Sequence, residues 1–525
     1  MKRILILAIA IISGTIATLA GGILTNTNQT VHFLRNPARG ASLEIDGVYT
    51  NPAGLIFLNE GFHFTLNNQS AFQERKITST FAPFAGNGDD ATKEFVGNAS
   101  AWLIPSFMAV YRIENWAISG SISVVGGGGT AVFDKGLPSF EALIAAPVAQ
   151  LSNAVGIPPN YSLNSKLEGS SIIFGAQIGV TYKINDNFSA FAGGRMSIVN
   201  NGYLGYLKEI NLPEANYMTN YFPAAAASAR GIASNMEQLA AAFGGSTTLG
   251  NVPLIKPEDI AQMAAGLGMT PEQISGLTLE QAQNAFNGAA AQADGAAQII
   301  EAGVNQLTNT KIELDTEQSG IGFAPILGLN INFGDFNFGI KYEFITKLEV
   351  ENKTKVNTTG IISFEDKEKT YHDIPALLTV GASYKIIAPL TFSCGYHHFF
   401  EKDARMGYDG KRQDNLDGGT NEILAGLEYR INPMFLVSCG FQMTRSGATD
   451  AYQQDLSYSL KSNSYGIGGT INFTENLKVN LGYFLTAYTD WTKDNIVDYY
   501  GTGLDGKEVF SRTSQAFGIG IDFSF

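Results

Sequence analysis

The chain has 525 residues, of which 45% are hydrophobic, 11% are aromatic and only 16% are charged, and its formal net charge is −14. Ordinary soluble domains have about a quarter of their residues charged, so this chain is poor in charge. A negative net charge argues against nucleic acid and anionic membrane surfaces as partners.

Residues 1–20 have the features of a secretory signal peptide. Lys2 and Arg3 precede the apolar run ILILAIAIISGTIATLA, and small residues lead up to Gly21. A charged start, an apolar core and a small-residue exit predict cleavage after Ala20 and export of the chain. An N-terminal membrane anchor is the alternative, but the apolar run is short for a spanning helix.

Residues 21–58 form a polar segment without regular alternation, which contains the sequence ARGASLEIDGVYTNPAGL. Pro52 fixes its own φ and offers no amide donor, so the corner Asn51-Pro52-Ala53 does not belong in the middle of a sheet. We therefore expect other parts of the chain to hold this corner in place.

From residue 59 onward the chain alternates apolar and polar residues, and no segment is apolar for long enough to predict a spanning helix. Short polar turns separate alternating runs and predict hairpins at residues 114–115, 185–187, 334–335, 387–388, 432–433 and 474–476. With a strand at each end, these turns give about fourteen strands, an even number as in bacterial outer-membrane barrels. Longer connections fall between them, near residues 75–99, 127–169, 205–309, 353–373, 402–417, 447–461 and 490–511.

The alternation of side chains along the last strand indicates whether each face meets lipid or the lumen. Phe517, Ile519, Ile521, Phe523 and Phe525 share one face, while two glycines, an aspartate and a serine share the other. The apolar face suits lipid and the other a filled or watery lumen. The predicted fold class is all-β, an antiparallel transmembrane β-barrel of about 14 strands over residues 59–525. A soluble β-sandwich is the alternative, but its outward face should be polar.

Residues 212–310, within the third long connection, differ from the rest. They are rich in Ala and have eight acidic residues against only Arg230 and Lys256. Thr270 and Thr278 each stand three residues before a Gln, which is the pattern of a helix capping box. We expect amphipathic helices in an extracellular loop, with their apolar faces covered by one another or by a hydrophobic ligand near the barrel mouth.

The order of these features resembles a known family. A signal peptide, NPAG directly before the first strand and about fourteen strands look like the FadL/TodX-type outer-membrane channels for long-chain fatty acids and other hydrophobic compounds. Residues 373–381, DIPALLTVG, are similar to the family's start of a mid-barrel strand. The likeness covers the N-terminal segment and most strands, and it fails in the long loops, where the Ala-rich insertion has no obvious counterpart.

The resemblance implies a fold and a function. Residues 21–58 would be a plug, or hatch, inside the lumen, and the corner Asn51, Pro52 and Ala53 would push into a kinked third strand. The C-terminal Phe525 would be a signal for the barrel-assembly machinery. The implied protein is a monomeric channel in the outer membrane of a Gram-negative bacterium, which takes up fatty acids or similar lipophilic molecules passively.

The third strand contains the run Gly126, Gly127, Gly128 and Gly129, which predicts an interruption of regular pairing. We expect an inward kink here, occupied by the corner 51–53, through which cargo leaves sideways into the hydrocarbon layer. In the simpler alternative, the four glycines are only the start of a flexible loop. A phosphate-binding loop does not fit, because no Lys and helix follow the run.

By alternation along their strands, three cationic side chains are predicted to face the lumen: Arg195, Lys341 and Lys347. Such cations would stabilise a carboxylate head group, or they would pair with lumen acids such as Glu343 and Glu349. The sequence does not name the cargo.

Other residue types point away from catalysis and cofactors. Cys394 and Cys439 lie on the lipid-facing parity of strands that another strand separates, so we expect small hydrophobes and not a disulfide or metal site. His397 and His398 face opposite ways in a strand, which disfavours joint metal binding. No enzyme motif and no cofactor site is evident. A surface barrel without cargo, structural or host-facing, and a lipid-hydrolysing barrel are the alternative functions.

Overall fold

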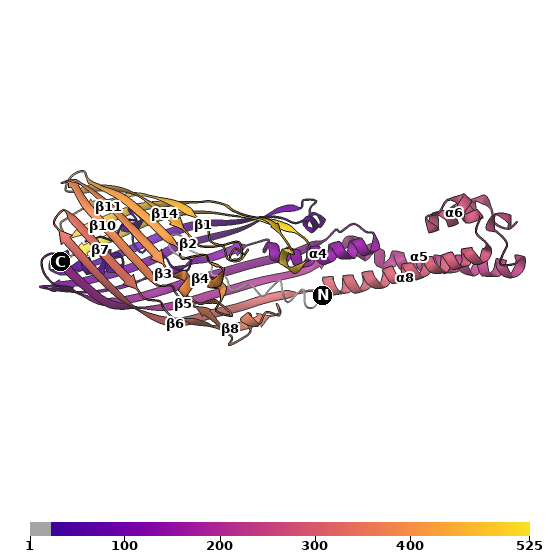
Figure 1. The fold of residues 1–525 in the computed structure, drawn as a ribbon, viewed down its shortest axis with the longest axis horizontal. Coiled ribbons are helices and arrows are strands. Elements are labelled where there is room, and N and C mark those ends of the chain that lie inside the picture. Colours follow the sequence, from indigo (N-terminus) through magenta and orange to yellow (C-terminus); the bar gives the residue numbers. More distant parts are fainter. Residues whose placement is uncertain (1–22) are drawn as a thin grey trace.

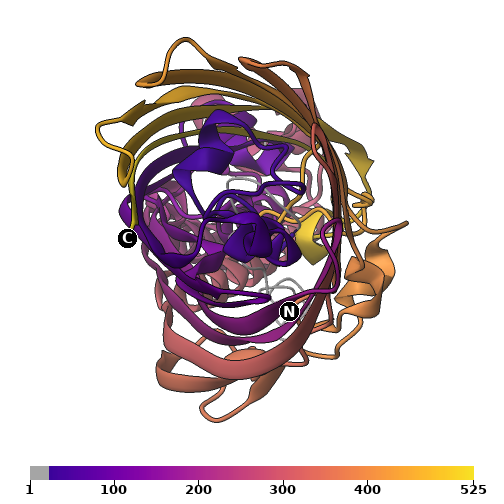
Figure 2. The ribbon, with the colours of Figure 1, turned by 90° about the vertical axis from the view of Figure 1, so that its left-hand side faces the viewer.

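The computed structural model describes residues 23–525, and eighteen strand segments of this range form one closed antiparallel sheet (Figures 1 and 2). The sheet closes because β1 (Gly61–Thr80) pairs with β18 (Gly506–Ser524) on one side and with β2 (Thr92–Ile113) on the other. The predicted signal peptide, residues 1–20, lies outside the described residues.

The segments make a barrel of fourteen strands, because four of these strands are interrupted. The interrupted strands are β7 (Phe336–Glu343) with β8 (Glu349–Asn357), β9 (Lys369–His372) with β10 (Leu377–Ile387), β11 (Leu390–Phe399) with β12 (Met406–Gly407), and β16 (Leu477–Tyr488) with β17 (Trp491–Ile496). The others are β3 (Trp116–Phe133), β4 (Ser162–Lys183), β5 (Phe188–Asn211), β6 (Ile312–Phe333), β13 (Asn421–Arg430), β14 (Phe435–Arg445) and β15 (Ser462–Asn472). The predicted strand number is confirmed.

Short hairpin turns join strands at one end of the barrel, on the left of Figure 1. The turns fall between β2 and β3, β4 and β5, β6 and β7, β10 and β11, β13 and β14, and β15 and β16, as predicted. The loops at the other end of the barrel are shorter than predicted wherever the strands extend further in that direction. The first, for example, spans only residues 81–91, because the ladder between β1 and β2 extends to Thr80 and Thr92.

The strands alternate as the sequence predicts. On β18, Phe517, Ile519 and Ile521 are exposed while Ala516 and Asp522 are buried, so the barrel has an apolar outer surface. The free cysteines Cys394 and Cys439 are exposed on it. Within residues 23–525, no helix combines the length and apolarity needed to cross a membrane.

The Ala-rich insertion is helical, as predicted. Its helices are α5 (Pro213–Phe243), α6 (Pro257–Leu267), α7 (Pro271–Ser275) and α8 (Leu279–Thr308). Figure 1 shows α5 and α8 running side by side away from the barrel, with α6 at the far end. Both predicted capping boxes form, at Thr270 and Thr278.

The apolar residues at the tip of the insertion bury one another. Met236 of α5, Met263 of α6, Ile274 of α7 and Phe286 of α8 belong to one buried cluster. The first alternative for this loop, helices that cover their own apolar faces, is therefore the arrangement at the tip. A further helix, α4 (Pro138–Val155), follows β3 where the sequence predicted only a long connection.

The N-terminal segment lies inside the ring of strands, as Figure 2 shows in indigo. We call residues 23–58 the hatch. It contains α2 (Val31–Arg35), α3 (Gly47–Thr50) and a 3-10 turn, η1 (Pro52–Phe57). Among residues 23–56, all but Leu43 and Glu44 are buried, so this segment is enclosed within the barrel.

Candidate functional site

The corner Asn51-Pro52-Ala53 rests on the inner face of β4 and β5. Thr181 Oγ1 donates to the Pro52 carbonyl at 2.7 Å, and Ser189 Oγ donates to the Ala53 carbonyl at 2.6 Å. Asn51 Nδ2 donates to the Ser42 carbonyl at 3.0 Å, which closes the corner on the hatch itself. The prediction that Asn51, Pro52 and Ala53 occupy a kink at Gly126–Gly129 is therefore wrong, because hydroxyl donors of other strands hold the corner.

The glycine run does interrupt the third strand. The register of β3 against β4 shifts between Val124 and Gly126, and again between Gly127 and Gly129. Gly127 and Gly129 have φ of 87° and 75°, a conformation that residues with a Cβ rarely adopt. A Cβ on Gly126 would lie 2.3 Å from the Leu24 carbonyl oxygen, so the hatch backbone approaches the strand closely here.

A different stretch of the hatch, Thr25–Gln29, fills the kink. The Asn26 amide donates to the Val125 carbonyl at 2.8 Å, and Asn26 Nδ2 donates to the Gly127 carbonyl at 3.1 Å. Gln29 Nε2 donates to the Val124 carbonyl at 3.1 Å. Sequence reasoning missed this stretch, although the run TNTNQT offers a polar side chain at every position.

The wall between β2 and β3 has a break at this level. The two strands pair from the partners Phe107 and Ile122 down to the short turn, and again from the partners Ser100 and Thr130 toward the opposite end of the barrel. The residues between these two pairs do not pair across β2 and β3. Trp102 of β2 is 71% exposed in the intervening stretch, and β2 remains joined to β1 through a bulge.

Hatch residues line the inner side of this break. Ser106 Oγ of β2 donates to the Gln29 carbonyl at 2.6 Å, while Gln69 Nε2 of β1 donates to the Asn28 carbonyl at 2.6 Å. Unpaired backbone groups cost several kcal/mol each in lipid, and the hatch satisfies carbonyls that the missing ladder leaves on β3.

Two predicted head-group residues, Arg195 and Lys341, meet at one place. Arg195 Nη1 and Lys341 Nζ donate to the Glu343 carboxylate at 2.6 and 2.5 Å, and Arg195 Nη2 donates to Gln177 at 2.7 Å. Lys341 Nζ also donates to the Tyr49 carbonyl at 2.6 Å, and both cations lie over the Tyr49 ring, at 4.7 and 4.3 Å. Pairing with Glu343, the alternative considered above, is the observed arrangement, and it ties the hatch to the wall.

Lys347 lies apart from this cluster. It is exposed, as is Glu349, whereas Thr346 and Leu348 are buried. The predicted lumen position of Lys347 is wrong because β7 and β8 are separate segments, and the chain between them inverts the alternation that a continuous strand would have kept.

A second set of charges holds the hatch to β13. Arg39 donates to Asp46 at 2.7 Å, to Glu44 at 2.7 Å and to Glu428 of β13 at 3.2 Å, and Arg35 also pairs with Glu428. Burial alone would raise the pKa of the Asp46 carboxyl, but the Arg39 guanidinium holds it below its usual value. Ion pairs thus attach the hatch to two parts of the wall, Glu343 of β7 and Glu428 of β13.

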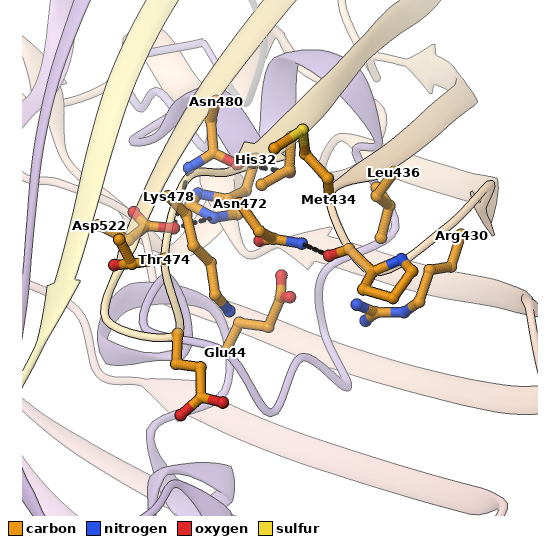
Figure 3. Close-up of a pocket in the computed structure, with 13 residues that line it drawn as sticks. His32, Glu44, Arg430, Met434, Leu436, Asn472, Thr474, Lys478, Asn480 and Asp522 are labelled. Atoms are coloured by element: carbon orange, nitrogen blue, oxygen red, sulfur yellow. Dashed lines mark hydrogen bonds and ion pairs between the residues drawn. The ribbon is translucent and has the colours of Figure 1, made fainter.

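Below the hatch, toward the short turns, lies a polar cavity of about 420 Å³ (Figure 3). His32 Nε2 pairs with Asp522 at 3.1 Å on its wall. Burial works against charge on His32, yet Asp522 leaves the pKa of its imidazole above the ordinary value. The lining residues are His32, Glu44, Arg430, Pro433, Met434, Leu436, Thr470, Asn472, Thr474, Glu475, Lys478, Asn480 and Asp522.

The interior above the hatch is filled mainly by apolar side chains, with a few buried charged residues such as Arg75 and Glu508 among them. Here α4 packs against the upper parts of the strands and the inward-folded loops. The buried cluster includes Ile77, Phe81, Phe95, Leu143, Tyr203, Leu460 and Phe510. The interior therefore changes from a mainly apolar core near the mouth to a polar cavity below the hatch, and the break between β2 and β3 lies between the two regions.

No protein-family model and no curated protein matches the chain. Solved structures do match. A FadL homologue from Pseudomonas aeruginosa aligns at a TM-score of 0.57 and 10% identity over 96% of this chain and all of its own. The toluene transporter TodX of Pseudomonas putida aligns at 0.50 and 12%, over 97% of this chain and 100% of TodX. The chain has their fold.

A TodX variant, described as a monoaromatic hydrocarbon channel, aligns at a TM-score of 0.51 and 12% identity, over 94% of this chain and 99% of its own. The FadL/TodX-type fold thus spans nearly the full length of each partner in all three comparisons. The identities are too low to carry over any individual residue, so the site described above rests on this chain's own contacts.

Proposed function

We propose that the protein is a channel of a Gram-negative outer membrane, which takes up hydrophobic molecules passively and releases them sideways through the break between β2 and β3. The break, stoppered by Thr25–Gln29, is the observation that carries this proposal. The mainly apolar interior above the break and the charged cavity below the hatch both favour sideways release. An apolar molecule gains nothing by entering a charged, watery space.

The remaining parts have matching roles in this proposal. Residues 1–20 are a signal peptide, residues 21–58 are the plug that contains the hatch, and residues 59–525 are a monomeric barrel with the extracellular insertion 212–310. Phe525 is the recognition residue for the barrel-assembly machinery. It exchanges backbone hydrogen bonds with Phe62 of β1 at 2.8 and 2.9 Å, which places the last residue on the closing seam. No cofactor and no nucleic acid takes part.

A reversible cross-link across the break tests the proposal. A Cβ built on Gly129 lies 3.4 Å from the Ala101 Cβ, close to the separation of about 3.8 Å in disulfides. Because the φ of 75° at Gly129 strains any residue with a Cβ, the reduced variant must first transport as the parent does. The variant Ala101→Cys/Gly129→Cys is made with Cys394→Ala and Cys439→Ala, so that the outer thiols are absent. We expect oxidation to block the uptake of labelled oleate by cells that lack other uptake channels, and a reductant to restore it.

The matched control locks the same two strands where they already pair. Ala109→Cys/Gly120→Cys joins direct partners of the β2–β3 ladder below the break, and its oxidation should leave uptake unchanged. Sideways release is refuted if the oxidised 101/129 protein, with its cross-link verified by mass spectrometry, transports at the rate of this control.

A further inference from the structure

Two polar side chains of β1, Asn68 and Ser70, lie on the outer side of the barrel wall. Their neighbours Asn67 and Gln69 are only 1% and 2% exposed and belong to the inner side. Because successive side chains of a strand point to opposite faces, Asn68 and Ser70 point outward, and both are partly exposed. The outer surface of this barrel is otherwise apolar, so a polar pair on it is unusual.

The pair lies at a height where the barrel meets lipid. The rings of Phe62 and Tyr111 stack at 4.4 Å, and those of Phe62 and Phe525 at 5.7 Å, at the short-turn end of the wall. Aromatic girdles of this kind border an apolar band about 25 Å tall. Asn68 and Ser70 follow Phe62 along the tilted strand β1, which places them about 15 and 20 Å above the girdle. Polar groups within this band are costly unless they are hydrogen-bonded.

The neighbouring strand β2 bulges toward lipid beside the pair. Its register against β1 shifts between Gln69 and Ala71, so that Trp102 and Leu103 together stand opposite Ser70. Such a two-against-one arrangement is a β-bulge, and it locally disrupts the ladder. Trp102 and Leu103 are 71% and 73% exposed, although successive residues of a regular strand face opposite sides. The backbone of β2 is therefore turned outward here.

The polar pair provides the partners for this outward backbone. Ser70 Oγ donates to the Trp102 carbonyl at 2.8 Å, and Asn68 Nδ2 donates to the same oxygen at 3.4 Å. The Ile104 amide donates to Asn68 Oδ1 at 3.0 Å. The Trp102 ring packs edge-on against Phe72 of β1, with 4.9 Å between the ring centres. We call these three hydrogen bonds the latch.

The latch and the hatch act on the two borders of the same break. Segment 101–106 of β2 is the stretch without a ladder to β3. From the inside, Asn26 and Gln29 of the hatch bind carbonyls of β3. From the outside, the latch binds the carbonyl and the amide of β2. Each strand at the break is thus bonded to a third element where it is not bonded to the other strand.

We propose that Asn68 and Ser70 are positioning residues of the exit, which hold segment 101–106 turned away from β3 and so keep the wall open for cargo. The inference rests on the proposed function and adds to it the means by which the break persists. Without the latch, the Trp102 carbonyl and the Ile104 amide would lose their partners in lipid, where no water replaces them. The edge of β3 that the break leaves unpaired offers new ones, so the segment turns back and closes the wall.

Uptake of labelled oleate by cells that lack other uptake channels tests the latch. The variant Asn68→Leu/Ser70→Ala loses all three hydrogen bonds, and we expect its uptake to fall about tenfold or more. Ser70→Ala alone should show a smaller fall, and it serves in place of the double variant if that one does not assemble. Ser70→Thr keeps the hydroxyl donor and should restore uptake. An assembled, heat-modifiable double variant that transports at the parent's rate refutes the latch.

A matched control removes a lipid-facing hydrogen bond that does not border the break. Gln515 of β18 is exposed on the outer side of the wall and accepts from the Tyr483 hydroxyl at 3.2 Å. Gln515→Leu should transport as the parent does. An equal fall in this control and in the double variant would show that the loss of any polar group on the outer surface impairs the protein, which overturns the specific role of the latch.

Lipid contact of the bulge reports its position directly. The chain has three tryptophans, so Trp116→Phe/Trp491→Phe leaves Trp102 alone, and a further Trp102→Phe/Leu103→Trp moves the fluorophore by one residue. With the latch intact, phospholipids with brominated chains should quench the fluorescence at both positions. Without it, a regular strand presents only one of them to lipid, so quenching at the other should fall by about half or more. Continued quenching at both positions refutes closure, even where uptake is lost.

The outcomes separate the latch from the proposed function. If the latch variants transport normally while the oxidised 101/129 cross-link still blocks uptake, the latch fails and sideways release stands. If neither change affects uptake, both are wrong.

Discussion

Glu343 is the residue on which we expect the attachment of the hatch to depend most. It accepts from both Arg195 and Lys341, and all three residues are less than 10% exposed. Glu343→Gln keeps the shape of the side chain but leaves two buried cations without a carboxylate. Breaking a buried ion pair in this way costs about 3–5 kcal/mol.

Lys341→Met is the informative comparison, because it leaves Arg195 and Glu343 paired with each other. Its main loss is the hydrogen bond to the Tyr49 carbonyl, about 1–3 kcal/mol for a buried acceptor left unsatisfied. Since about 1.4 kcal/mol is a tenfold change in an equilibrium constant, Glu343→Gln should raise the population of released hatch by roughly two to four orders of magnitude. Lys341→Met should raise it by about one to two.

Limited proteolysis of the hatch in outer-membrane vesicles opened on the short-turn side measures this population, because cleavage follows the open fraction when opening is fast. Lys347→Met serves as the control, since Lys347 is exposed and outside the cluster, and its hatch should be as protected as the parent's. If Lys341→Met releases the hatch as readily as Glu343→Gln, charge balance is not what holds it.

Further predictions concern other parts of the chain. Burial raises the pKa of Glu401 to about 7 from its ordinary 4.5, so its contribution to stability is present at low pH and lost as the pH rises through this window. In Glu401→Gln, this loss of stability should be absent. Denaturant titrations at pH 5 and pH 8 measure it as the difference in the free energy of unfolding. Thr278→Ala should cost the insertion about 1 kcal/mol, seen as earlier helix melting by circular dichroism. Replacing residues 245–277 with a short linker should leave the barrel's heat resistance on gels unchanged, because the tip has its own core. Deleting Phe525 should lower the fraction of assembled, heat-modifiable barrel, and normal assembly would exclude it as the recognition residue.

Local features of the barrel could be read from the sequence. Hairpin turns and capping boxes depend on residues within a few positions of one another, and these predictions are confirmed at sites such as Thr270 and Thr278. Alternation was equally informative on β18, which is continuous. It failed at Lys347, because the break before β8 has no signal in a pattern that assumes an unbroken strand.

Contacts between distant segments could not be predicted in the same way. The sequence offered a proline corner and a glycine kink, and the prediction joined them, whereas the structure joins the kink to Thr25–Gln29. The helix α4 was not predicted from the sequence, and it contains Pro147, a residue that is ordinarily unfavourable in the interior of a helix. Arg75 and Arg512 look like ordinary strand charges in the sequence, and only the pairing of β1 with β18 that closes the barrel sets them side by side.

The order of strands has a consequence for folding. Every ladder of the barrel except one joins strands that follow each other along the chain, and the exception is the seam between β1 and β18. Closing a loop costs more entropy as the loop lengthens, so the seam is the slowest pairing to nucleate and the last to form. Because the hatch directly precedes β1, it stays next to the open edge until then, and it can settle onto the curved sheet without threading through a finished ring.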